Sequence, residues 1–296
     1  MKKIKKIIKA IKNRDLIYKS YICFSQLIGF SNDKIKDLEL RNKKFINIRK
    51  KYKIKKEYSS EEYKEKNLNV WILWLQGLED APKIVKKCVQ NIYKYLSNYD
   101  IHIITAQNYM EYVSLPDFVV KNWKKGIISN THFADIMRTE LLIEHGGLWI
   151  DSTCYIMKEI PEYIFEKKLF MFTYKCIEDN TIKCNNWFIY SQPNNRTLKI
   201  IRDLLFEYWK KEKYLKEYFL WQFFATMAFE KYPEDYRDIY YLTDETPHYL
   251  GRNLLKKFDE EYWKILSDIS FIYKLNYKFD KSLSIEGTYL EYIYKN

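Results

Sequence analysis

An acidic and a basic side chain stand three residues apart in the stretch HFADIMRTELLIEHGGLWIDST, residues 132–153. On a helix, this spacing places Asp135 and Arg138 on one face. The chain has 43 Lys but only 8 Arg, and Arg138 is the only arginine between positions 49 and 196. A planar guanidinium can bind phosphate or sugar hydroxyls through two parallel hydrogen bonds, which a lysine cannot do. The alternative is that Asp135 and Arg138 pair with each other in a surface ion pair of little energetic value.

A further acidic residue, Asp151, directly follows the apolar residues 148–150. A short apolar run is typical of a buried strand, and in open α/β sheets ligands bind beyond the carboxyl ends of the strands. Ser152 and Thr153 add hydroxyl oxygens to the carboxylate of Asp151. Oxygen ligands of this kind suit a hard divalent cation. The pattern therefore predicts a ligand site at the end of this strand.

The segment before Asp151 has the signals of a helix followed by a turn. Asn130 or Thr131 is expected to cap the helix, and its apolar residues recur at helical spacing. Gly146 lies where a helix ends in the left-handed conformation that glycine tolerates. The residues predicted to form the buried face of this helix are Phe133, Ile136, Met137 and Leu141.

Further upstream, the pattern predicts a strand, a helix and a second strand. Residues 70–75 and 101–105 are apolar runs, as expected of buried strands. Between them, Asp80 is expected to cap an amphipathic helix with Pro82 in its first turn. Two strands joined through a helix imply a parallel pair. Short helices are expected within residues 108–125.

The composition is that of a folded globular chain. Hydrophobic residues make up 47% and charged residues 30% of the 296 residues, and a chain of this length buries a large core without disulfides. The five cysteines include no CxxC pair, which favours reduced thiols in a cytosolic compartment. The motifs GxGxxG, GxxxxGK[ST], GxSxG and HExxH are all missing from the sequence. No apolar run approaches the ~20 residues of a membrane span.

Positive charge is concentrated in the N-terminal part of the sequence. Residues 1–66 hold 21 Lys and Arg against 8 Asp and Glu, a balance of +13, whereas residues 67–296 hold 30 against 31. Isoleucines at helical spacing among the lysines of residues 1–20 predict a helix that makes peripheral contact with an anionic membrane. The alternative is a solvated basic helix folded back on the core. We expect no nucleic-acid binding, because base readout favours Arg over Lys. The predicted division is a basic helical extension with a linker, 1–66, and one α/β domain, 67–296.

Five segments together resemble the capsular polysaccharide synthesis protein family of bacterial glycosyltransferases. They appear in the family's order and are WILWLQGLEDAPKIVKKC (71–88), FADIMR (133–138), GGLWIDST (146–153), NNWFIYSQPNN (185–195) and KLNYK (274–278). That family is related to sugar transferases with a DxD motif and a GT-A fold. The resemblance implies a GT-A-like, mostly parallel sheet flanked by helices. It also implies a nucleotide-sugar substrate and a divalent metal cofactor, Mn2+ or Mg2+.

The resemblance also assigns roles to individual residues. Trp74 matches an aromatic residue that stacks on the nucleotide base, Asp135 an acid that holds sugar hydroxyls, and Arg138 a group that reaches the sugar and the phosphate. Asp151 matches the first Asp of the DxD motif, and Thr153 stands in place of the second. These two residues are therefore the expected metal ligands. The other positions expected to bind the nucleotide sugar are Gln76, Gly77, Asn186 and Lys274.

The function implied by the resemblance is the transfer of a sugar from a UDP-sugar, with retention of configuration, onto a growing capsular or other cell-surface polysaccharide. The acceptor would be a glycan or a lipid-linked oligosaccharide, met in the cytoplasm at the inner face of the cell membrane. Two alternatives stay open: a non-catalytic basic adaptor that binds a membrane surface or nucleic acid, and a glycoside hydrolase with paired carboxylates. Stabilisation by UDP would favour the transferase, and release of free sugar without a nucleotide would favour the hydrolase.

Overall fold

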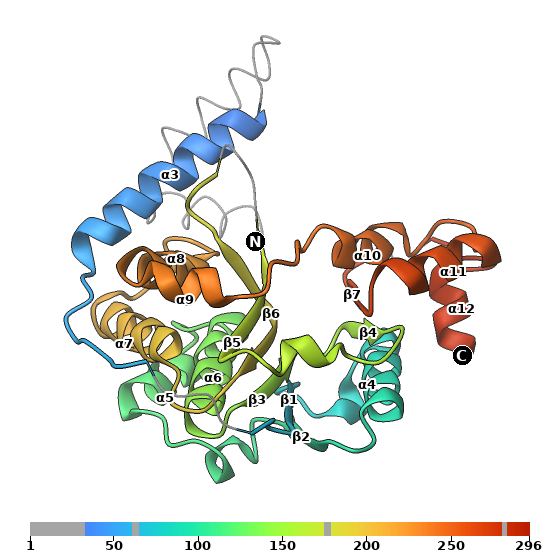
Figure 1. Cartoon of the computed structure of the whole chain (residues 1–296), viewed down its shortest axis with the longest axis horizontal. Coiled ribbons are helices and arrows are strands. Elements are labelled where there is room, and N and C mark those ends of the chain that lie inside the picture. The colour runs from blue at the N-terminus through green and yellow to red at the C-terminus, as the bar shows by residue number, and fades with distance from the viewer. Residues whose placement is uncertain (1–32, 61–64, 175–178, 280–282) are drawn as a thin grey trace.

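The computed structural model describes residues 33–60, 65–174, 179–279 and 283–296 (Figure 1). Within these residues, five strands form one sheet in the order β2-β1-β3-β6-β5. They are β1 (Asn69–Leu73), β2 (Asp100–Ile104), β3 (Gly147–Ile150), β5 (Leu169–Thr173) and β6 (Cys184–Ser191). β1 is parallel to β2 and β3, whereas β6 is antiparallel to β3 and β5. Only β6 therefore opposes the others, and the predicted mixed α/β, mostly parallel sheet is confirmed.

The predicted strand–helix–strand unit is present. α4 (Lys83–Tyr95) connects β1 to β2, and Asn69 lies opposite Asp100 in the parallel register. The prediction that Asp80 caps α4 is wrong. Asp80 ends a short 3-10 helix (Leu78–Asp80), and Pro82 is the N-cap residue of α4 with extended backbone angles (φ −54°, ψ 147°). This extended residue separates Asp80 from the first turn of the helix.

The helix that carries Asp135 and Arg138 is α6 (Asn130–Glu144). Its cap is Ser129, whose Oγ accepts a hydrogen bond from the backbone N–H of His132 at 3.4 Å. The prediction of a cap at Asn130 or Thr131 is wrong, because both residues already lie in the helix while Ser129 is extended. The predicted buried face is confirmed by the burial of all four of its residues.

Gly146 closes the turn between α6 and β3. Its φ of 68° confirms the predicted left-handed conformation, and its carbonyl accepts a hydrogen bond from the indole of Trp71 at 2.8 Å. A Cβ at this position would lie 2.9 Å from the carbonyl oxygen of Ser191. Both the backbone angle and the lack of space therefore require glycine here.

Each face of the sheet has its own hydrophobic core, because strand side chains alternate between the faces. Trp71 and Trp149 belong to the first core, and Ile72 and Ile150 to the second. The first core is covered by α3 (Asp33–Lys51), α5 (Asp117–Lys124), α6, α7 (Arg196–Lys211) and α8 (Leu220–Lys231), with α9 (Pro233–Asp238) beside α8. The second is covered by α4, α10 (Tyr249–Asn253), α11 (Glu260–Ile269), α12 (Tyr289–Lys295) and the strands β4 (Cys154–Ile156) and β7 (Ile272–Lys274). Figure 1 shows these two groups on opposite sides of the sheet. The other short 3-10 helices are Tyr109–Glu111, Glu162–Ile164 and Thr246–His248.

The long helix α3 packs against α8, where the ring of Phe45 meets that of Phe223 edge-to-face at 5.0 Å. Phe45, Ile48 and Tyr52 are buried in the first core. Lys51 Nζ and Tyr52 Oη donate to Oε1 of Glu212 at 2.5 and 2.7 Å. The helix expected within residues 1–20 lies outside the described residues, and the division into 1–66 and 67–296 stays a prediction.

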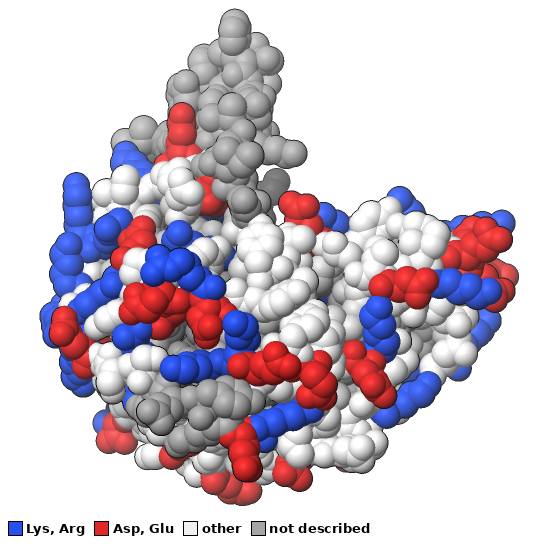
Figure 2. Space-filling view, viewed as in Figure 1, with Lys and Arg blue, Asp and Glu red and all other residues white. Residues whose placement is uncertain are grey.

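Side chains of both charges are interspersed on the face drawn in Figure 2. Three described cysteines, Cys88, Cys154 and Cys184, are buried free thiols. Among the described helices, each is too short or too polar to cross a bilayer.

Candidate active site at the end of β3

Pairing of β4 with β7 brings Lys274 to the end of β3. Asp151 directly follows β3, and the chain then turns into β4. Cys154, the first residue of β4, lies opposite Lys274 in the antiparallel pair. The N–H of Leu275 donates to the carbonyl of Thr153 at 2.9 Å. Lys274 is thereby held beside Asp151 although the two are 123 residues apart in sequence.

Both carboxylate oxygens of Asp151 have partners. Lys274 Nζ donates to Oδ2 at 2.8 Å, and it also donates to Oγ1 of Thr153 at 2.5 Å. The indole N–H of Trp149 donates to Oδ1 at 2.9 Å. Arg138 Nη2 lies 3.6 Å from the same Oδ1. The carboxylate therefore lies between two cations and an indole N–H.

Arg138 is 5% exposed and is surrounded by polar groups. Its Nη1 donates to the carbonyl of Asn186 at 2.5 Å, and its Nη2 lies 3.6 Å from Oδ1 of Asp135. The guanidinium carbon is 4.8 Å from the ring centroid of Trp149, a cation–π distance. The side-chain amide of Asn186 donates to Oδ1 of Asp135 at 2.9 Å. The contact between Asp135 and Arg138 is therefore part of a buried network and is not a surface ion pair.

The opposite charges of Asp151 and Lys274 stabilise the ionised form of both groups. Burial raises the pKa of Asp151, but the positive charges of Lys274 and Arg138 outweigh this effect, so the pKa is below its ordinary value. Burial alone would lower the pKa of Lys274. The negative charge of Asp151 outweighs the effect of burial, so the pKa of Lys274 is above its ordinary value. Both groups are ionised at neutral pH.

The structure joins six of the predicted site residues in one network of contacts: Asp135, Arg138, Asp151, Thr153, Asn186 and Lys274. Trp74 is half-buried, and its ring meets Tyr277 edge-to-face at 5.6 Å. Tyr277 is three residues after Lys274, so Trp74 lies near the same segment. Gln76 is exposed, and Gly77 has a φ of 84°. None of the described contacts joins Gln76 or Gly77 to the network.

A hollow of about 600 Å³ opens beside the network. Lys274 lies in its wall together with His248, Arg252, Asn276 and Phe279. Basic, amide and aromatic side chains in one wall can bind a phosphate and a sugar or base at the same time. Lys274 therefore connects the buried network to a space of ligand size.

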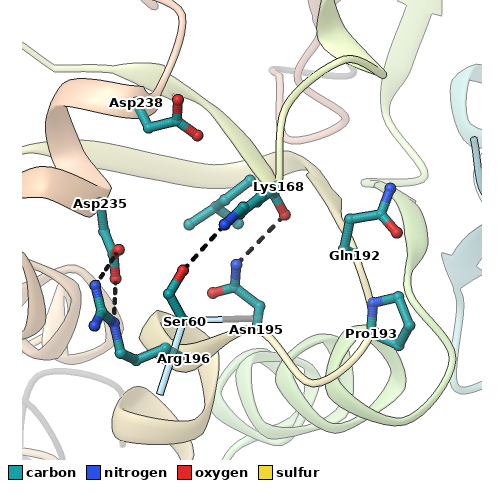
Figure 3. A pocket seen from close by; sticks show the side chains of 9 residues that line it. Ser60, Lys168, Gln192, Pro193, Asn195, Arg196, Asp235 and Asp238 are labelled. Atoms are coloured by element: carbon teal, nitrogen blue, oxygen red, sulfur yellow. Dashed lines mark hydrogen bonds and ion pairs between the residues drawn. The ribbon is translucent and has the colours of Figure 1, made fainter. Parts of the chain in front are cut away.

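A second cavity, shown in Figure 3, is only about 30 Å³. There Arg196 pairs with Asp235 at 2.6 Å, and Lys168 donates to Ser60 at 3.2 Å. About one water molecule fits in such a volume. The ion pair is thus a structural contact between α7 and α9, and we place no ligand there.

The groups around Asp151 do not fit a divalent ion as they stand. The two predicted ligands, Asp151 and Thr153, are both bonded to the ammonium of Lys274. In the part of the chain that the structure describes, no three His, Cys, Asp or Glu side chains gather where they could hold an ion together. Hard divalent cations prefer several oxygen ligands. The predicted Mn2+ or Mg2+ stays a prediction of the resemblance.

Sequence reasoning missed two contributors to the network. Trp149 was expected only as a buried strand residue, although side chains two apart on a strand share a face, which places Trp149 beside Asp151. Gln222 of α8 donates to Oδ1 of Asn186 at 3.3 Å, and no local pattern indicates this contact. His132 Nδ1 lies 3.1 Å from Oδ2 of Asp135.

Two known proteins are similar to parts of this chain. A curated relative, the O-glycosyltransferase braB of Annulohypoxylon truncatum, is 26% identical over 108 residues, which are 33% of this chain and 26% of that protein. The match thus spans about a quarter of the relative's length. Among solved structures, the PaToxG glycosyltransferase is similar with a TM-score of 0.40 and 14% identity, over 66% of this chain and 77% of that one.

The model of one protein family matches residues 23–293, which include β1 to β7 and every residue of the network. Its description is "capsular polysaccharide synthesis protein". The family suspected from the five sequence segments is thereby confirmed: this chain belongs to the capsular polysaccharide synthesis protein family.

Proposed function

We propose that this protein is a glycosyltransferase with a GT-A-like domain. Its substrate is a nucleotide sugar, and the proposed nucleotide is UDP. The sugar is transferred with retention of configuration. The supporting observation is that the buried Arg138 lies between the carboxylates of Asp135 and Asp151. Asp151 is also bonded to Lys274, which lines the hollow. Family membership and the glycosyltransferase relative agree with this activity.

The reaction breaks the bond between the anomeric carbon and a diphosphate oxygen, so negative charge grows on the leaving nucleoside diphosphate. Preorganised cations in a water-poor site stabilise such charge strongly. The side chain of Lys274 is 21% exposed and that of Arg138 only 6%. Lys274 can therefore touch the diphosphate, while Arg138 contributes its charge from within the network. The resemblance assigns sugar hydroxyls to Asp135, but its side chain is only 7% exposed and its Oδ1 already accepts from Asn186, so Asp135 would act by holding the network in place.

The proposed acceptor is a growing surface glycan or a lipid-linked oligosaccharide. The printed description of the family supports a capsular polysaccharide. The proposed place is the cytoplasmic face of the membrane, supported by the +13 balance of residues 1–66. The contact would be made by residues 1–20, outside the described residues.

The test of this function is consumption of nucleotide sugars by the purified chain and by Asp151→Asn. We expect release of UDP from a UDP-sugar by the wild type and a loss of about 100-fold or more in turnover for Asp151→Asn, the scale for removal of a key electrostatic group. Asp268→Asn, an exposed site on α11, is the matched control and should turn over normally. Equal turnover by both variants, or no UDP binding by the wild type, would contradict the proposal.

A further inference from the structure

The ammonium of Lys274 lies where the divalent ion is expected. It bonds the two side chains that the resemblance assigns to the metal, Asp151 at 2.8 Å and Thr153 at 2.5 Å. We propose that Lys274 takes the place of this ion and that the protein binds the diphosphate of its nucleotide sugar without a divalent metal. The inference rests on the proposed function and adds to it the group that neutralises the diphosphate.

The backbone of Lys274 is fixed, so the contact is part of the fold. Lys274 lies opposite Cys154 in the β4–β7 pair, and the next residue bonds back to Thr153. Gly251 of α10 packs so closely that a Cβ there would lie 2.4 Å from the carbonyl oxygen of Lys274. A helix and a strand thus hold this lysine from two sides.

The charges favour a monovalent cation at this position. Asp151 already has Arg138 Nη2 at 3.6 Å from one oxygen and Lys274 Nζ at 2.8 Å from the other. A divalent ion bound to this carboxylate would add two positive charges within a few ångströms of Arg138 and Lys274. The site is partly shielded from water, so the repulsion would be strong. The protein would offer such an ion a single carboxylate, so its other ligands would have to come from water and from the diphosphate itself.

Lys274 has the capacity to bind a phosphate. An ammonium has three N–H donors, and Asp151 and Thr153 accept two of them. The side chain keeps 21% of its surface exposed, and Lys274 is one of the residues that line the 600 Å³ hollow. Neither of the two bonds uses the third donor, which remains for a phosphate oxygen.

The experiment is titration calorimetry of UDP with the full chain, in EDTA and in MnCl2. We expect the wild type to bind UDP in EDTA, with an affinity that MnCl2 changes by less than about 2-fold. Lys274→Met should weaken UDP binding in EDTA by about 10-fold to 100-fold, the usual worth of a hydrogen bond between charged groups. Lys264→Met on α11, an exposed lysine, is the matched control and should bind as the wild type does.

The outcomes separate the two proposals. Binding of UDP by the wild type only in MnCl2 would overturn the role of Lys274 and leave the transferase proposal intact. No binding in either buffer would contradict the UDP-dependent transferase itself. Equal UDP affinity of Lys274→Met and wild type in EDTA would also overturn the inference. If Lys274→Met fails to fold, UDP binding by the wild type in EDTA and in MnCl2 still shows whether a divalent metal is needed.

Discussion

Replacement of Arg138 by lysine tests whether the shape of this cation matters as well as its charge. The guanidinium uses all three of its nitrogens: Nε donates to the carbonyl of Ala134 at 3.4 Å, Nη1 to that of Asn186, and Nη2 faces Asp135 and Asp151 at 3.6 Å each. One ammonium keeps the charge but cannot reach all three directions. Arg138→Lys should therefore lose at least two of these interactions in a buried place.

The loss can be estimated from the cost of unmade hydrogen bonds. At about 1–2 kcal/mol for each buried partner left without a bond, the free energy of unfolding should fall by about 2–4 kcal/mol. For the 296 residues of this chain, the entropy of unfolding is about 0.6 kcal/mol/K, so such a change lowers the melting temperature by roughly 3–6 °C. Turnover should fall by about 10-fold or more, because the positive charge moves away from Asp151.

Thermal unfolding and UDP release measure the two effects separately. Arg237→Lys, at an exposed position of α9, is the matched control and should change neither quantity. If the melting temperature and the turnover of Arg138→Lys equal those of the wild type, the reasoning that the planar guanidinium is required is refuted.

Two further predictions concern stability. Burial raises the pKa of Glu212, but its bonds to Lys216, Lys51 and Tyr52 outweigh burial and lower it from 4.5 to about 2. Because the pKa of Glu212 is lower in the folded state, the stabilisation from its ionised carboxylate is complete above pH 4.5 and is lost as the pH falls towards 2. The difference in melting temperature between wild type and Glu212→Gln should therefore shrink over that range. A difference that stays constant would contradict this prediction. Gly146→Ala should cost about 2 kcal/mol or more in urea unfolding, because a positive φ and a backbone clash coincide there. Gly126→Ala, with a φ of 70° and nothing within 4 Å, should cost only about 1 kcal/mol, and equal costs at both positions would show that the clash has no effect.

The parts of the fold that the sequence predicts are those with local signals. Apolar runs locate β1 and β2 to within one or two residues, and helical spacing gives the buried face of α6. The left-handed turn at Gly146 is also a local signal, since few other residues adopt it. The caps of α4 and α6 were misplaced because several neighbouring residues can cap a helix, and the backbone angles of Pro82 and Ser129 decide which one does.

The candidate site is only partly contained in such local signals. The spacing of Asp135 and Arg138 predicts their contact, and the end of β3 predicts the position of Asp151. The bond between Asp151 and Lys274 depends on strand pairing across 123 residues, which no periodicity reveals. Among 43 lysines, Lys274 stands out only through the resemblance. Its position on the expected metal ligands becomes visible only in three dimensions.

The long separation of Asp151 from Lys274 has a consequence for synthesis on the ribosome. Translation adds about 5–20 residues per second, so roughly 6–25 s pass between the two residues. During that time β3 and its tip exist without the ammonium, and Asp151 has only Trp149 and Arg138 as partners among those described. The nascent chain can thus assemble its central strands before it acquires the lysine of the site. The bond between Asp151 and Lys274 can therefore form only late in synthesis, when β7 joins β4.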